Sequence, residues 1–417
     1  MIPKDKQLFK FSAYGFLKNL RFFDAFIILF FRQQGISFLQ IGTLVSIREI
    51  SIAILEIPTG IIADSYGRRS SMIFSFLSYI ISFLIFFFFP KFSFYIVAMI
   101  FFAMGEAFRT GTHKAMILEY LNIKNIKHLK VEYYGFTRSW SQKGSALAAL
   151  IAGGIVLFSG NYKYIFIGSI VPYILALFLM ISYPKELDGI TKKDSHPNFL
   201  KAIWINLSNT TREFINVFKD PLLRRSIINS SLFDGLFKTV KDYIQPIIKA
   251  FAISAPFLIF MSEKRDTVMI SIVYFVLFFL SSIASRNSEK FKNKFDSLAG
   301  AINKSYILGI LFVIASGLFY ICGLKLITII CFIIFYMFQN LRRPMNVGYI
   351  SGIIPSGIMA SGLSAESQLK TFFIAVLSPV TGYLADTFGI GVAIIILSFL
   401  TLSAFPLIRV RKLEGKL

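Results

Sequence analysis

Long apolar blocks separated by short polar segments run along the whole chain. Two of them, Ile73–Phe89 and Thr267–Ala284, contain no Asp, Glu, Lys, Arg or His. A helix of about 20 predominantly apolar residues spans the roughly 30 Å of hydrocarbon in a bilayer, whereas a membrane β-barrel shows shorter segments of alternating polarity. Because backbone groups in lipid must satisfy their own hydrogen bonds, the pattern predicts an all-α membrane protein.

Twelve segments have the apolar character of membrane spans. We expect transmembrane helices over 13–32, 39–60, 71–89, 94–118, 137–158, 164–183, 226–248, 267–285, 299–321, 326–349, 366–384 and 390–408. The longest polar stretch, Pro184–Arg225, divides them six and six. We therefore expect an N-terminal six-helix bundle over 1–183, a basic cytoplasmic linker over 184–225 and a C-terminal six-helix bundle over 226–417. The apolar part of Lys249–Asp266 is too short to cross, and whether it forms an external helix stays open.

The composition agrees with a membrane protein and offers no cofactor chemistry. Hydrophobic residues make up 55% of the chain and charged residues 16%, whereas about a quarter of a soluble domain is charged. The two cysteines, Cys322 and Cys331, form neither a disulfide framework nor a zinc spacing, so we expect no metal and no cofactor. The N-terminus lacks a small-residue cleavage site after an apolar core, so we expect the first span to direct insertion.

The net charge of +22 would suggest nucleic acid in a soluble protein. Here no basic stripe interleaves with aromatic residues, and the positive-inside rule explains the excess better. With both termini in the cytoplasm, the cytoplasmic segments hold 24 Lys and Arg residues and the opposite side holds 6. We therefore expect a multi-pass protein of the inner (plasma) membrane with cytoplasmic termini. We expect it to be a monomer without a nucleic-acid partner.

The segment Gly60–Arg69 between the second and third spans has the chemistry of a tight cytoplasmic hinge. It reads Gly-Ile-Ile-Ala-Asp-Ser-Tyr-Gly-Arg-Arg. Gly67 permits a turn with positive φ, and Asp64 can accept hydrogen bonds near a helix end. Arg68 and Arg69 hold the loop at the cytoplasmic face.

This spacing resembles the signature loop of the major facilitator superfamily, G-x-x-x-D-x-x-G-R-R/K. The preceding Glu-Ile-Pro-Thr-Gly, the position after the second of twelve spans and the basic loop between the halves are similar to that family as well. The resemblance implies two six-helix bundles that rock around a central site, in a secondary transporter rather than an enzyme. It also implies that Asp64, Arg68 and Arg69, with Gly67 at the turn, gate the cytoplasmic side.

Other motifs narrow the possible functions. Drug–proton exporters of the family often carry G-P-x-x-G-G in the fifth span, and Ala149–Gly154 lacks that proline. The second copy of the signature loop, expected within 286–298, has lost the pattern. The chain has no G-x-x-x-x-G-K-S/T nucleotide loop, nucleophile elbow or H-E-x-x-H segment, which disfavours an ATP-driven pump and a membrane enzyme.

Ionisable residues inside the predicted spans are functional candidates, because each costs about 2.5–3.5 kcal/mol on insertion scales. The deep basic residues are Arg21, Arg48, Arg109, Lys238, Lys241, Arg342 and Arg343. The deep acidic residues are Asp24, Glu49, Glu56, Glu106, Asp234 and Asp242. The two sets nearly balance, so salt bridges between helices explain most of them. Spans one, four, seven and ten, which line the central cavity in the family, all carry such charges.

The seventh span has the most informative polar face. Its members are Asp234, Lys238, Lys241, Asp242 and Gln245. At about 3.6 residues per turn they share one broad face, which must line an aqueous cavity or meet charged partners. Asp234 and Lys238 form an i,i+4 pair in the favourable order, and Pro246 can bend the helix. A neutralised face that only joins helices is the competing interpretation.

Roles follow from the charges. Basic and amide side chains can hold a carboxylate or phosphate. We predict that substrate is bound by Arg21, Arg109, Lys238, Lys241, Gln245, Arg342 and Arg343. Carboxylates in partly dry surroundings can carry a proton, and those that we predict to couple protons are Asp24, Glu49, Glu106 and Asp234. Glu106 lies one turn from Arg109 and could alternate between proton and substrate. His113 shares that face and could titrate near neutrality, although simple hydrogen bonding is the commoner role.

Three functions compete at this point. The first is a proton-coupled transporter of a small organic anion, favoured because basic residues outnumber acids four to two on spans seven and ten. The second is a proton-driven multidrug exporter that uses the same acids. The third is a non-transporting receptor or lipid-handling protein on the same fold. The expected partners are a small solute, protons and membrane lipid, while the solute, the direction and the coupling ion stay open.

Overall fold

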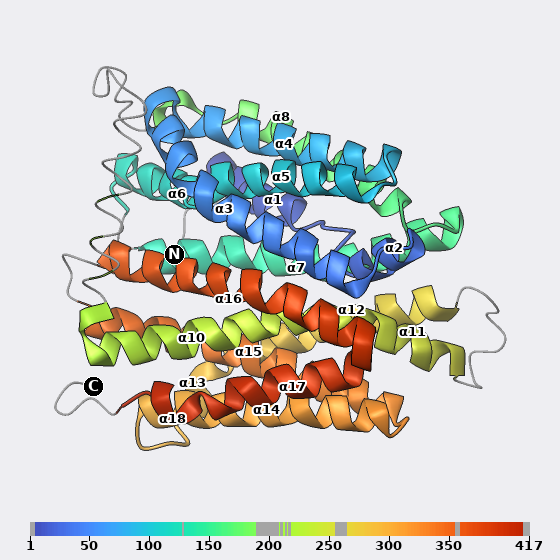
Figure 1. The fold of residues 1–417 in the computed structure, drawn as a ribbon. Coiled ribbons are helices and arrows are strands. Elements are labelled where there is room, and N and C mark those ends of the chain that lie inside the picture. Colours follow the sequence, from blue (N-terminus) through green and yellow to red (C-terminus); the bar gives the residue numbers. More distant parts are fainter. Residues whose placement is uncertain are drawn as a thin grey trace. The chain divides into compact units, whose positions relative to one another are not determined.

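A computed structural model describes the chain except for residues 1–4, 127–128, 189–207, 209–211, 213–214, 216–217, 255–264, 355–358 and 412–417. Within the described part every regular element is helical, which confirms the all-α prediction. Contacts divide the chain into two compact units (Figure 1). The first contains Met1–Phe26 and Ile47–Leu207, and the second contains Ile27–Ser46 and Ser208–Leu417.

The first unit is a bundle with an aromatic core. Its elements are α1 (Lys6–Lys18), most of α3 (Phe38–Tyr66), α4 (Arg68–Phe88), α5 (Phe92–Arg109), α6 (Thr112–Ile123), α7 (Lys130–Ser159), α8 (Tyr164–Ile181) and the 3-10 helix η2 (Lys185–Asp188). Helix α4 packs against α5 and α8, and α1 packs against α7 and α8. Tyr79 and Phe83 of α4 meet Tyr173 of α8 edge to face, with ring centroids 5.2 and 5.0 Å apart. Such pairs add about 0.5–1.5 kcal/mol each beyond area burial.

The second unit contains the remaining helices. These are α2 (Ile27–Gln33), the start of α3, α10 (Pro221–Val240), the 3-10 helix η3 (Lys241–Tyr243), α11 (Ile244–Ser254), α12 (Arg265–Arg286), α13 (Ser288–Lys292), α14 (Leu298–Ile321), α15 (Lys325–Ile353), α16 (Met359–Phe388), α17 (Ile390–Ser403) and α18 (Phe405–Ile408). Helix α10 packs against α15 and α16, and α14 packs against α15 and α17. Proline at the first position of α10 follows Asp220, whose carboxylate accepts the N–H groups of Leu222 and Leu223, a favourable helix start.

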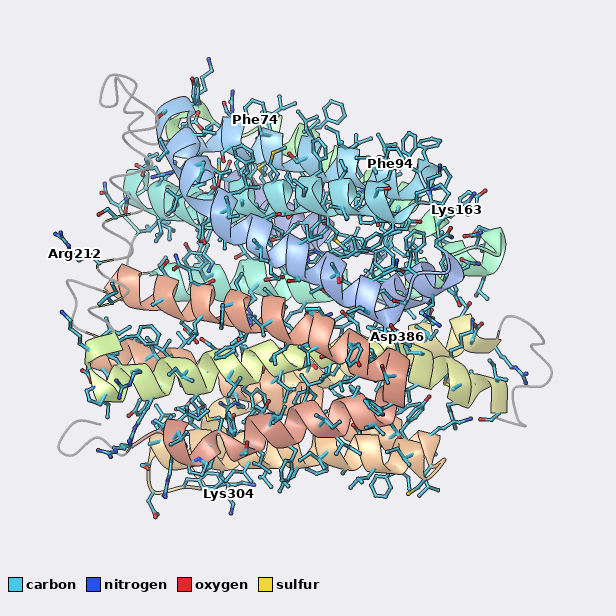
Figure 2. All side chains as sticks on the ribbon, viewed as in Figure 1. Phe74, Phe94, Lys163, Arg212, Lys304 and Asp386 are labelled. Carbon is cyan, nitrogen blue, oxygen red and sulfur yellow. The ribbon has the colours of Figure 1, made fainter. Side chains whose placement is uncertain are left out.

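Large apolar side chains cover the outer faces of these helices. Phe74 of α4 and Phe94 of α5 are 49% and 41% exposed, and both project away from the bundle (Figure 2). Nine helical segments of the described part are long and apolar enough to cross a membrane. Surfaces of this size would be unusual facing water, whereas lipid solvates them, so the many phenylalanines serve the lipid boundary as well as the core.

Three spans that the sequence predicts as continuous helices are interrupted. In the first, the backbone is non-helical between Lys18 and Ile27. In the fourth, α5 ends at Arg109 and α6 begins at Thr112, with Gly111 at φ +80°. In the seventh, η3 separates α10 from α11. Irregular backbone at membrane depth occurs where it is buried in protein or faces water, and broken helices in both halves of a membrane protein are a pointer to a binding site.

The start of α3 is held by α16 within the second unit. The carboxylate of Asp386, at the end of α16 (Figure 2), accepts the N–H groups of Phe38 and Leu39 at 3.0 and 2.8 Å. Further along, the hydroxyl of Ser46 donates to the carbonyl of Ala375 at 2.7 Å. One boundary of the compact units along the chain therefore falls within the continuous helix α3, and the bundle boundaries expected at the basic linker stay a prediction.

The segment whose structure the sequence left open is helical as far as Ser254, the end of α11. Its residues 255–264 lie outside the described part, as does most of the predicted basic linker. The ammonium of Lys249 lies 3.6 Å from a carboxylate oxygen of Asp266.

Candidate functional site

A charged cluster lies beside the breaks of the first and fourth spans, within the first unit. The guanidinium of Arg21 donates to one carboxylate oxygen of Glu106 at 2.5 Å. Arg109, one turn further along α5, donates to the other oxygen of Glu106, and its Nε lies 3.3 Å from the hydroxyl of Tyr79. The three charged side chains are only 15–21% exposed. One carboxylate is therefore shared by two largely buried guanidinium groups.

Further polar groups surround this cluster. Lys18 and Asp24 lie within electrostatic range of Arg21, and the hydroxyl of Tyr173 donates to the Lys18 carbonyl at 3.4 Å. The Tyr14 hydroxyl, beside Arg109, and the Nε of Arg21 are buried, and neither makes a hydrogen bond of normal geometry to a described residue. Tyr14 and Arg21 thus place two further buried polar atoms in the cluster, of which the Tyr14 hydroxyl interacts with Arg109.

The local sequence explains how this cluster forms. Tyr14 and Lys18 are four residues apart on α1, so they project from one side of it, and Arg21 follows three residues later in the non-helical segment. Glu106 and Arg109 are three apart in the last turn of α5, where side chains are neighbours. Sequence reasoning identified the two arginines and both acids but not the tyrosines, and it set Lys18 aside because this residue stands near the end of a predicted span.

Two other predicted groups of the first unit have local partners. The ring of His113 stacks on Tyr14 with ring centroids 3.6 Å apart, and its Nε2 lies 3.3 Å from the Tyr183 hydroxyl, which agrees with the hydrogen-bonding role considered for it. Glu49 is 4% exposed, and one of its oxygens lies 2.8 Å from the guanidinium of its chain neighbour Arg48.

The signature loop is fastened to the rest of the first unit. Gly67 has φ +92°, which confirms the predicted turn, and a side chain there would be strained. The N–H of Arg69 donates to the Asp188 carboxylate at 2.6 Å, and Arg68 lies 3.2 Å from Glu119. The Asp64 side chain lies outside the described residues. The four gating roles stay a prediction.

The charged face of span seven is divided by the 3-10 turn. Lys241 and Asp242 pair with each other at 2.6 Å within η3, while Asp234 accepts a hydrogen bond from Gln339 at 2.7 Å on α10. Lys238 is an exposed side chain of α10. Gln245 is fully buried; it accepts the N–H of Ile28 at 2.9 Å and donates to a tyrosine hydroxyl at 3.0 Å. It therefore holds the first turn of α2.

The two arginines of span ten have different surroundings. Arg342 is 1% exposed, donates to the Asn229 side chain at 2.9 Å and the Ile302 carbonyl at 2.7 Å, and lies 4.2 Å from the Phe233 ring centroid. Arg343, the next residue, is exposed. Arg342 therefore satisfies protein groups in this structure, and the substrate roles of both arginines stay predictions.

These contacts belong to a polar seam between α10 and α15. We define the polar seam as Asn229, Ser230 and Asp234 of α10 with Gln339, Arg342 and Asn346 of α15. In it, the Asn346 amide donates to the Ser230 hydroxyl at 3.1 Å. That hydroxyl donates to the carboxyl group of Glu366 on α16. Glu366 was not counted among the deep acidic residues because it is the first residue of the span expected over 366–384, but α16 begins at Met359.

Comparisons with known proteins agree with this fold. An uncharacterized MFS-type transporter of Bacillus subtilis (strain 168), YxaM, is 21% identical over 396 residues, which cover 93% of this chain and 92% of that protein. The nucleoside transporter NupG superposes with a TM-score of 0.75 at 12% identity, covering 98% of this chain and 100% of that one. A POT family transporter in complex with 5-aminolevulinic acid superposes with a TM-score of 0.70 at 14% identity, covering 97% of this chain and 96% of that one. A D-xylose-proton symporter superposes with a TM-score of 0.66 at 14% identity, covering 98% of each chain.

At these identities the solved structures establish the fold alone. The family assignment comes from the sequence profile of the Major Facilitator Superfamily, which matches residues 16–365. That match covers most of the chain, including the signature loop, both charged spans of the cluster and the polar seam. The protein therefore belongs to the Major Facilitator Superfamily.

Proposed function

We propose that the protein is a secondary active transporter that moves a small organic anion by alternating access and is driven by protons. Family membership supports transport, and the cluster of the first unit supports the charge of the solute. The observation that carries the proposal is that two guanidinium groups share the Glu106 carboxylate at the breaks of spans one and four.

The charge balance of the cluster favours an anion. Three basic side chains, Lys18, Arg21 and Arg109, stand against two acidic ones, Asp24 and Glu106. One positive charge is therefore in surplus, and one carboxylate on the solute would balance it. Two unit charges 4 Å apart interact by about 4 kcal/mol at an effective dielectric constant of 20. An energy of that size separates an anion from a neutral solute of the same shape by roughly a thousandfold in affinity.

The same geometry supports proton coupling. A proton on Glu106 removes the charge that holds Arg21 and Arg109, so both guanidinium groups become available to a solute carboxylate. Guanidinium groups bind carboxylates through two parallel hydrogen bonds. The proton and the anion then favour each other's binding, which is the coupling that symport requires.

Proteins of the same fold support a small polar solute. One solved POT family transporter holds 5-aminolevulinic acid, and a peptide transporter POT holds sulfate. Another relative by fold is a D-xylose-proton symporter. We take these as support for a small polar solute and for protons as the driving ion.

Transport in proteoliposomes under an imposed proton gradient tests the proposal. We expect uptake of small carboxylates and none of cationic dyes or neutral sugars. Arg109→Ala should abolish uptake, whereas Lys304→Ala, at an exposed position on α14, should not. Anion uptake that survives both Arg109→Ala and Lys238→Ala would refute the binding assignment. Extrusion of cationic dyes instead would support the multidrug exporter.

The proton carriers are tested in the same vesicles. We expect Glu106→Gln to uncouple uptake from the proton gradient and Asp234→Asn to weaken the coupling. If both variants accumulate the anion as well as the unmodified protein, neither residue carries the proton.

We also propose that the protein is a monomer in the inner (plasma) membrane with cytoplasmic termini. Cys322 is exposed after the end of α14, and Cys331 is buried in α15. The proposed orientation places Cys322 outside the cell. A membrane-impermeant maleimide should therefore label intact cells at Cys322, and Cys331→Ser should not change the labelling. Labelling that requires permeabilised cells would reverse the orientation.

A further inference from the structure

A carboxyl group in the second unit is hydrogen-bonded to a buried network of neutral side chains. Glu366 of α16 accepts the hydrogen of the Ser230 hydroxyl on α10. Ser230 in turn accepts from the amide of Asn346 on α15 at 3.1 Å. Ser230 and Asn346 are 2% and 5% exposed. Three helices therefore fix the position of one carboxyl oxygen without using a cation.

The backbone beside this carboxyl group is held as well. The hydroxyl of Ser231 donates to the carbonyl of Glu366 at 2.9 Å. Helices α10 and α16 pack along their length, and the neighbouring Ala365 belongs to the apolar core that they share. The hydrogen bond from Ser230 is thus built into a tightly packed contact and does not depend on a mobile surface side chain.

The charges near Glu366 come from each helix around it. Asp234 lies on α10, Arg343 on α15 and Lys370 one turn further along α16. Among the described residues none of these cations reaches ion-pair distance of Glu366. Arg343 is exposed, so solvent or lipid headgroups screen it. Asp234 adds a like charge that opposes ionisation.

Glu366 differs in this way from Glu106. Glu106 has two guanidinium groups in direct contact, whereas Glu366 has one hydroxyl donor. Glu366 is half-buried; partial burial of an ionised carboxylate without a partner cation is unfavourable, and a neutral carboxylic acid avoids that cost. A carboxyl group of this kind takes up or releases a proton when its access to water changes.

We propose that Glu366 binds and releases a proton during the transport cycle, with Ser230 and Asn346 as positioning residues. This inference rests on the proton coupling of the proposed function. The proton comes from hydronium in the adjoining water. An O–H bond forms at Oε2, because Oε1 already accepts the hydrogen of Ser230, and a water molecule is left behind. Release reverses this step when the group is hydrated again.

The first test observes the proton directly and does not need transport. Infrared difference spectra of the purified full-length protein between acid and alkaline pH report the carbonyl stretch of protonated carboxyl groups. Glu366→Gln should remove one such band. Glu289→Gln, the same change at an exposed site on α13, should leave that band in place. Identical spectra for the Glu366→Gln variant and the unmodified protein would overturn the proposal.

The second test separates proton coupling from solute movement. For one proton per solute, a gradient of about one pH unit drives roughly tenfold accumulation. Glu366→Gln should abolish this accumulation, while exchange of labelled for unlabelled solute, which needs no net proton movement, stays within about twofold of the unmodified rate. Retained accumulation would overturn the proposal.

A third variant keeps the acid and changes only its position. Ser230→Ala removes the hydroxyl donor and should shift the pH midpoint of uptake to higher pH, since the ionised carboxylate loses a hydrogen bond. An unchanged midpoint would refute the positioning role. Absence of accumulation in the unmodified protein would refute the proton coupling of the proposed function instead, and the infrared band would still decide whether Glu366 takes up a proton.

Discussion

Replacing Glu106 with Gln tests the charge cluster most sharply. The substitution keeps the size of the side chain but leaves Arg21 and Arg109 without their shared carboxylate. Removing one partner of a buried ion pair costs about 3–5 kcal/mol. The lower end applies here, because the three side chains retain 15–21% exposure. We therefore expect Glu106→Gln to lower the free energy of unfolding by about 3 kcal/mol.

A double-mutant cycle isolates the ion pair from other effects of the substitution. Arg109→Gln alone leaves Glu106 paired with Arg21 and should cost less, about 1–2 kcal/mol. The loss of unfolding free energy in the double variant should be smaller than the sum of the two single losses by about 1–2 kcal/mol. Chemical denaturation of the purified protein in detergent measures all three, with Glu289→Gln as the matched surface control.

Solute binding gives a second, independent measurement on Glu106→Gln. The surplus of the cluster rises from one to two positive charges, so a solute carboxylate should bind at least about tenfold more tightly, or 1.4 kcal/mol. Binding to the unmodified protein should weaken as pH rises, because the ionised Glu106 competes for both arginines. Binding to the variant should not depend on pH in this way.

Two results would refute this reasoning. If Glu106→Gln unfolds within about 0.5 kcal/mol of the unmodified protein and the cycle is additive, the two contacts carry no significant energy. If the variant binds anions more weakly at every pH, Glu106 helps to hold the solute and does not compete with it.

Two further substitutions test the packing of the second unit. A methyl group on Gly382 would lie 2.1 Å from the carbonyl oxygen of Phe38, so Gly382→Ala should lower the free energy of unfolding by at least about 2 kcal/mol; Gly154→Ala, with no atom within 4 Å, is the control in a thermal unfolding assay. Arg342→Met removes the donors to two buried acceptors and should lower the free energy of unfolding by about 3 kcal/mol. Its control, Lys304→Met, should change that free energy by no more than about 0.5 kcal/mol. Equal melting temperatures for a variant and its control would contradict the assigned contacts.

The positions of the helices could be predicted from the sequence because lipid requires long apolar segments. The helix of span three, for example, was expected over 71–89 and is α4, Arg68–Phe88. The turn at Gly67 could be predicted for a similar reason, since a glycine between two helices is a local signal. The contact between Glu106 and Arg109 was also local, at i,i+3.

The helix breaks and the partners across helices could not be predicted in the same way. Hydropathy records how apolar a segment is but not where its backbone leaves the helix, so the interruption between Lys18 and Ile27 was invisible. The contact of Arg21 with Glu106 joins residues 85 positions apart. Many other charged pairings were equally compatible with the pattern. Glu366 was set aside because it stood at the end of a predicted span, and the neutral side chains of its hydrogen-bond network, Ser230 and Asn346, lie on other helices.

The contact between Asp386 and the start of α3 has a consequence for biosynthesis. The carboxylate and the N–H of Phe38 that it accepts are 348 residues apart in the chain. At a synthesis rate of about 5–20 residues per second, the first turn of α3 waits roughly 17–70 s on the ribosome before its partner exists. Contacts of such long range form late. The growing chain must therefore insert its first two spans and hold them without this contact until nearly the whole protein has been made.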